Sequence, residues 1–219
     1  MTHGEQRPLM YTPAQRQAVD EHVDRFFGEP SSTFQELYSP DIQVNISIIA
    51  PSPEHPWTTL ATVGAGAAPM NVPIEASGEV PDRAEYLICL PPNWRFNQDP
   101  QTGEIPEEQY WPIRLLKDLS RLPVEQGSWI SGGDTISWDE PFPNTDGLCA
   151  ALLLGPYQFE PGAQVAELPE GEEVAFYEAV PLHRAEAEFA NLHGADALID
   201  QLEDVVGDFV EVGRPDTCA

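Results

Sequence analysis

The chain has 219 residues, of which 41% are apolar and 21% charged, as expected for a folded globular protein with one well-buried core. Its 37 acidic side chains outnumber the 10 basic ones, giving a formal net charge of -27 at pH 7. Such a surface repels phosphate backbones and anionic lipid headgroups, so binding to nucleic acid or to a membrane surface is disfavoured and a basic protein partner is favoured. The charge is also explained by solubility or by a salty habitat, and that alternative stays open.

Cysteine usage and hydropathy indicate the compartment. The three cysteines, Cys89, Cys149 and Cys218, are too few and too scattered for a disulfide framework or a zinc site. Cys89 and Cys149 fall within the apolar stretches YLICL and LCAALLL, which predicts buried free thiols. The N-terminus lacks an apolar stretch of signal-peptide length, and no window approaches the ~20 apolar residues of a membrane helix. We therefore expect a cytoplasmic protein.

In chain order, the pattern predicts a short tail, a helix and three strands. Residues 1–12 are expected to form a flexible N-terminal tail. Thr12-Pro13 is a typical helix start, and the apolar stripe that follows ends at Gly28. IQVNISIIA alternates apolar and polar residues as a half-buried strand does, and AEYLICLP is apolar enough for a central strand. The predicted strands span residues 42–50, 57–64 and 84–91, and the first two can pair as a hairpin.

The stretch WPIRLLKDLSRLP predicts a helix with an apolar and a basic face. Pro112 is expected to begin this helix and Pro123 to end it. Arg114, Lys117 and Arg121, which include the only lysine of the chain, share the basic face. We expect them to pair with neighbouring carboxylates, with a partner-docking stripe as the alternative. The predicted buried face consists of Leu115, Leu116, Leu119 and Leu122.

The second half of the chain predicts two more strands and two more helices. The strands span residues 148–155 and 173–182, and Gly194 separates helices at 183–194 and 195–206. Residues 207–219 are expected to be a C-terminal tail. This order of elements predicts a single α+β domain over residues 13–206, with a central mixed β-sheet packed with helices.

No motif in the chain has the spacing of a catalytic or metal site. GAGAAP at residues 64–69 resembles a phosphate-binding loop, but a third glycine is missing and Pro69 stands where a helix should open, so a structural turn is favoured. The five histidines lie outside metal-ligand motifs, and the pair Cys149 and His183 places its thiol in an apolar strand where it should be inert. The carboxylate runs lack a calcium loop and are typical of solvated acidic faces. We therefore expect no catalytic residues, no metal and no cofactor.

Seven stretches occur in an order that resembles the Suppressor of fused-like domain family. Together they extend over roughly residues 15–205, and the ordered set is specific although each stretch alone is weak. The resemblance implies a fold like the N-terminal domain of Suppressor of fused, no enzyme activity and a role in binding other proteins. The stretches are IQVNISIIAPSPEHPWTTLATVGAGAAPM, AEYLICLPPNW, WPIRLLKDLSRLP, SWISGGDTISW, FPNTDGLCAALLL, VAFYEAVPLHRAEAEF and HGADALIDQL.

The resemblance also implies a partner-binding segment. The GD-x-x-SW stretch matches a family segment associated with partner binding, which makes Gly133, Asp134, Ser137 and Trp138 the candidate site residues. Single-domain bacterial members are proposed immunity proteins, so we expect a bacterial immunity protein that neutralises a polymorphic toxin. The acidic surface favours a basic toxin. A scaffold subunit with a constitutive interface and an enzyme of unrecognised type are the alternatives. Trp138 as a core residue and Asp134 as a turn residue is the competing interpretation of the site.

Overall fold

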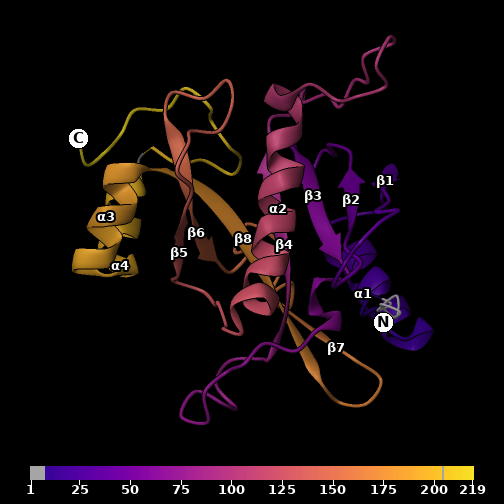
Figure 1. Ribbon diagram of the computed structural model, residues 1–219. Helices are drawn as coiled ribbons and strands as arrows, with labels where there is room; N and C mark the ends of the chain where they lie inside the picture. Colours follow the sequence, from indigo (N-terminus) through magenta and orange to yellow (C-terminus); the bar gives the residue numbers. More distant parts are fainter. Residues whose placement is uncertain (1–7, 204) are drawn as a thin grey trace, which may run out of the picture.

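The computed structural model describes residues 8–203 and 205–219, which form one mixed sheet with helices on both faces (Figure 1). The N-terminal tail expected at residues 1–12 lies mainly outside the described residues, although Tyr11 is buried. The helices are α1 (Pro13–Phe26), α2 (Glu107–Gln126), α3 (Arg184–His193) and α4 (Ala195–Leu202), with a 3-10 turn, η1, at Ala65–Ala67. The strands are β1 (Ser32–Phe34), β2 (Asn45–Ile49), β3 (Thr58–Val63), β4 (Arg83–Leu90), β5 (Thr135–Ser137), β6 (Leu148–Leu154), β7 (Val165–Glu167) and β8 (Glu173–His183).

The strand order is β1-β2-β3-β4-β8-β6-β5, and β7 pairs with β8 beside this path. The β2–β3 hairpin and the central position of β4 confirm the sequence predictions. β4 and β8 are parallel and all other pairs are antiparallel, so the sheet is mixed as predicted. The parallel register ends where Leu87 faces Glu178, although β4 continues to Leu90 and β8 to His183.

Side-chain alternation along β8 assigns the helices to the two faces of the sheet. Ala179 belongs to the core cluster under α2, which contains Leu115, Leu116 and Leu119. Phe176 and Leu182 point to the opposite face, where they join the clusters under α1 and under α3 and α4, respectively. Figure 1 shows α2 lying alone across its face of the sheet. No described helix is long and apolar enough to cross a membrane.

The predicted bounds of α2 are wrong at both ends. Pro112 and Pro123 are buried inside the helix, which begins after Pro106 and ends at Gly127, whose φ of 59° is left-handed. An interior proline forfeits one backbone hydrogen bond and disfavours helical backbone before it. Both rings face the core here, and the apolar packing of Trp111 and its neighbours offsets that loss.

The basic face of α2 serves the fold, as the favoured interpretation predicted. Glu36 accepts from Lys117 Nζ at 3.2 Å through one oxygen and from Arg121 Nη2 at 2.8 Å through the other. Lys117 also lies 4.9 Å from the centre of the Phe34 ring. Arg114 pairs with Glu107, about two helix turns earlier in α2. The ion pairs therefore hold the segment that follows β1 against α2.

The GAGAAP stretch binds an internal anion rather than a phosphate. The backbone N–H groups of Gly64, Ala65 and Gly66 donate to the carboxylate of Glu85 at 2.9, 3.2 and 3.1 Å. Glu85 is fully buried on β4 and also accepts from the hydroxyl groups of Tyr11 and Thr62. Burial raises the pKa of Glu85, and the hydrogen bonds from Thr62, Gly64 and Tyr11 oppose that shift.

Replacing Leu119 by alanine should lower the free energy of unfolding by about 2–5 kcal/mol, because a fully buried leucine leaves a cavity. Val124, on the same helix but 38% exposed, is the matched control, and its replacement should cost less than about 0.5 kcal/mol. Urea unfolding of the two variants measures the difference. Equal midpoints for both would contradict the assignment of the helix faces.

Candidate protein-binding site

β5 is an edge strand, and within the described residues it pairs only with β6. Trp138 N–H donates to the carbonyl of Cys149 on β6, and the carbonyl of Asp134 accepts from Leu153 N–H. Backbone groups in an antiparallel pair alternate in direction, so those of Thr135 and Ser137 point away from β6. The edge therefore presents a short row of backbone donors and acceptors to an incoming strand.

The turn before β5 holds two of the predicted site residues in structural roles. Gly133 has a φ of 92°, which favours glycine, and its N–H donates to the carbonyl of Leu153. A carboxylate oxygen of Asp134 accepts from the N–H of Ser131 at 2.7 Å. Asp134 is half-buried and fixes the turn that starts the edge strand, in agreement with the competing interpretation of this residue.

Trp138 lies at the end of β5, half-buried against the core. Its indole N–H donates to Asp118 on α2 at 3.0 Å, and its ring meets Phe142 edge-on with centroids 5.4 Å apart. Burial raises the pKa of Asp118, while the hydrogen bond from Trp138 lowers it. The indole is therefore part of the packing between α2 and the segment after β5. Ser137, one residue earlier, is exposed.

A groove of about 420 Å³ runs beside Trp138, between α2 and residues 138–143. Its apolar lining comes largely from Trp138, Trp111 and Phe142, and the last two stack with ring planes 4° apart. Its charged lining residues are Arg114, Asp118, Asp139 and Glu140. Three carboxylates against one guanidinium make the groove acidic as well as aromatic, a combination that suits a cationic side chain.

Sequence reasoning missed most of this groove. Trp111 and Asp118 are on a predicted helix, but no pattern in the chain indicates that they meet Trp138. Phe142 follows in a proline-rich link, and its backbone N–H donates to the carbonyl of Leu148 on β6. Only the tertiary packing of α2 against the segment that follows β5 brings these side chains together.

The described residues offer no cluster of three or more side chains suited to a metal ion. Cys89 and Cys149 are buried free thiols, as predicted, and Cys218 is a half-exposed one. Burial raises the pKa of Cys89 well above its ordinary value, which makes this thiol a poor nucleophile. His183 Nε2 lies 3.1 Å from the carbonyl oxygen of Arg214, and the ring of His22 stacks on Phe176.

The mixed sheet, with α2 on one face and β5 as an edge strand, defines a single α+β domain. The family model described as Suppressor of fused protein matches residues 40–215. This chain therefore belongs to the Suppressor of fused protein family. A search of curated protein sequences gave no significant match.

Solved structures with the same fold include three from this family. A chain of the Sufu–Fu complex has a TM-score of 0.62 at 15% identity, with 93% of this chain and 91% of that chain covered. A Suppressor of fused homologue from Neisseria gonorrhoeae has a TM-score of 0.62 at 18% identity, with 93% and 96% covered. Drosophila Suppressor of Fused has a TM-score of 0.56 at 16% identity, and the match covers 89% of this chain but only 48% of that one. At these identities the likeness shows the fold.

Proposed function

We propose that this protein is a non-enzymatic binding module that takes an extended segment of a partner protein at the β5 edge. The observation that carries the proposal is the outward direction of the Thr135 and Ser137 backbone groups on a strand with one free side. An added strand gains main-chain hydrogen bonds from such an edge, and neighbouring pockets select its side chains. Membership of the family supports the proposal, since a fold-related chain was solved in a Sufu–Fu complex.

The four predicted site residues take complementary roles in this proposal. Ser137 supplies backbone hydrogen bonds, while Gly133 and Asp134 set the turn that presents the strand. Trp138 forms the wall of the adjacent groove, where an apolar or cationic side chain of the partner would lie. The hydrogen bond to Asp118 limits the indole to one orientation, so little conformational freedom is lost on binding.

The partner proposed for this site is a basic protein, with a toxin neutralised by an immunity-type protein as the specific case. Support comes from the formal net charge of -27 and from the acidic groove beside β5. A field of this sign accelerates encounter with a cationic partner and repels nucleic acid. Salt should slow the association, because the Debye length is about 8 Å at physiological ionic strength.

Replacing Ser137 by proline should abolish partner binding while the domain stays folded. Proline removes the outward N–H that an added strand needs, and an edge position tolerates it. Ser137→Ala keeps the N–H and loses only an exposed side chain, so it is the matched control and should bind as wild type. The assay is rescue of growth when each variant is co-expressed with the protein encoded beside it in the native host, together with binding of the purified pair.

Two outcomes would count against the proposal. Rescue and binding by Ser137→Pro would remove the β5 edge from consideration. Failure of Ser137→Ala would place the interaction on the side chain rather than on the strand edge. Circular dichroism and urea unfolding of both variants establish that any loss of binding is local.

A further inference from the structure

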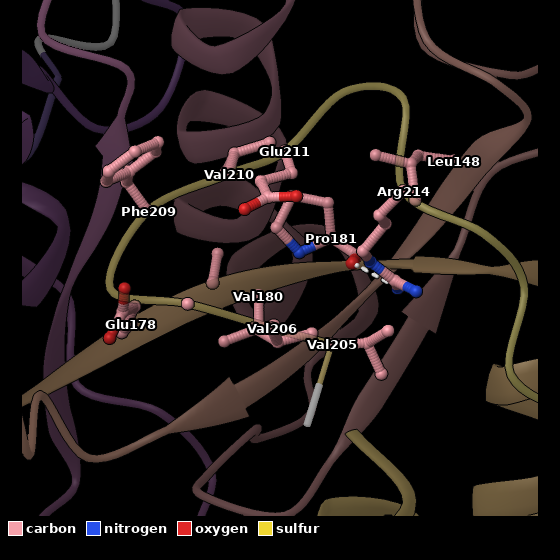
Figure 2. Close-up of a pocket in the computed structure, with 12 residues that line it drawn as sticks. Leu148, Glu178, Val180, Pro181, Val205, Val206, Phe209, Val210, Glu211 and Arg214 are labelled. Carbon is pink, nitrogen blue, oxygen red and sulfur yellow. Dashed lines mark hydrogen bonds between the residues drawn. The ribbon is translucent and has the colours of Figure 1, made fainter. Parts of the chain in front are cut away.

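The C-terminal segment fills a split in the sheet. β4 and β8 separate after Leu87 and Glu178, and residues 205–211, here called the strap, lie over the gap. Figure 2 shows the strap running past β8. Its side chains divide between the two faces of the sheet, because Val210 belongs to the core cluster under α2 whereas Phe209 packs against the cluster under α1. Within the described residues, Val210 makes the backbone hydrogen bond that links the strap to β4, at 2.9 Å from the carbonyl oxygen of Cys89.

The segment is firmly anchored just beyond the strap. Arg214 is 4% exposed, pairs with the fully buried Glu186 and donates to the carbonyl of Pro181 at 3.0 Å. The carbonyl of Val212 accepts from Asp146 N–H. Figure 2 places Arg214 and Glu178 at opposite ends of the cavity under the strap. This cavity measures about 20 Å³, so at most one water molecule fits between strap and sheet.

The other end of the strap lies over a carboxyl group with few compensating partners. Glu178 accepts from the Gln158 amide at 2.6 Å, and Gln158 also donates to the Cys89 sulfur at 3.4 Å. The strap also carries Asp208, an exposed carboxylate whose negative charge contributes to the raised pKa of Glu178. Glu211 and Arg214 line the same cavity, and Arg214 is already neutralised by its ion pair with a buried glutamate.

We infer that the strap switches between two states with the protonation of Glu178. It packs against the sheet while Glu178 is protonated and detaches when Glu178 is ionised, and Arg214 holds the chain in place just beyond it. The strap lies apart from the β5 edge, and the inference is independent of partner binding there. Protonation removes both the burial cost of the Glu178 carboxylate and its repulsion from Asp208. Lifting the strap breaks the hydrogen bond to Cys89 and uncovers that thiol.

The direction of the pH effect follows from the cavity. Burial raises the pKa of Glu178 to about 7, hydrogen bonds from Gln158 and Cys89 act against this, and Asp208 adds to it. The closed form therefore holds the proton more tightly than the open form does. Closure is favoured fully below the ordinary glutamate pKa and is weakened progressively as pH rises through about 7.

Hydrogen–deuterium exchange between about pH 5.5 and about pH 8, corrected for intrinsic rates, tests the inference, with an expected rise on the order of tenfold at the strap amides. Residues 212–216 should show no such rise, because the ion pair of Arg214 with Glu186 holds them independently of Glu178. Glu178→Gln, which cannot ionise, should abolish the rise, and Asp208→Asn should reduce it. Glu203→Gln is the matched control, because this exposed carboxylate precedes the strap and does not line the cavity, and it should behave as wild type.

Alkylation of Cys89 by iodoacetamide at a single pH of about 8 provides an independent readout, in which wild type should react about tenfold faster than Glu178→Gln. Cys149, buried away from the strap, should react equally in both proteins. A pH-independent strap in wild type, or the same pH dependence in Glu178→Gln, would overturn the inference. If Glu178→Gln does not fold, the test is the wild-type protein, in which the pH dependence of exchange at the strap is compared with that at residues 212–216.

Discussion

Replacing Glu85 by alanine is expected to lower the free energy of unfolding by at least about 3 kcal/mol. The carboxylate accepts from two hydroxyl groups and from the three N–H groups of residues 64–66, all in the interior. Its removal leaves these donors without a partner in a site closed by Tyr11. Chemical unfolding followed by tryptophan fluorescence measures the loss.

Glu172 is the matched control for this experiment. It belongs to the same region through its bond to Arg83 at 3.1 Å, but its side chain is 40% exposed. The Glu172 side chain is solvated and Arg83 keeps its hydrogen bonds to the carbonyls of Gly66 and Ala67, so Glu172→Ala should cost less than about 1 kcal/mol. Glu85→Gln keeps the size and one acceptor and should fall between the two. A Glu85→Ala protein as stable as Glu172→Ala would contradict the role of Glu85 in ordering the GAGAAP turn.

Replacing Arg214 by alanine should cost about 3–5 kcal/mol, because it leaves a buried carboxylate without its cation. Glu186 is fully buried and receives both Arg214 amino groups together with the N–H groups of Thr217 and His183. Burial alone would raise the pKa of Glu186, but the hydrogen bonds from Arg214, Thr217 and His183 lower it below the ordinary value. This contribution to stability is present above the ordinary glutamate pKa and is lost as pH falls through the lowered value.

Two further variants test the cause of that loss. Arg16 forms an exposed pair with Asp20 one turn away on α1, so Arg16→Ala should cost less than about 0.5 kcal/mol. The double change Glu186→Leu with Arg214→Met removes both charges at similar volume and should recover most of the stability. Unfolding curves at neutral and at acidic pH would then show Arg214→Ala approaching wild type as pH falls. A constant difference across pH would contradict the ion-pair explanation.

Secondary structure was predicted correctly where a local sequence pattern determines it. Alternation identified β2, and the Thr12-Pro13 start located α1 because a capping box with Gln15 forms there. β1 and β7 were missed because three-residue strands carry no usable period. The ends of α2 were wrong because tertiary packing overrides the local preference of proline.

The same limit applies to the candidate site. Family resemblance located residues 133–138, but their sequence does not indicate which backbone groups face outward or that Trp138 bonds Asp118. Those facts depend on the pairing of β5 with β6 and on the position of α2. Residues 205 and 206 of the strap were expected to be helical, but α4 ends at Leu202. The rest of the strap was expected to be part of a C-terminal tail, because neither a helical nor a strand period marks residues 207–212.

The central claim is that an extended partner segment pairs with the free side of β5. The most direct measurement is hydrogen–deuterium exchange at single-residue resolution on the purified protein with and without its native partner. The claim predicts new protection at the amides of Thr135 and Ser137, with little change at β1 on the opposite edge of the sheet. Unchanged exchange at both amides in a stable complex, with protection elsewhere, would contradict it.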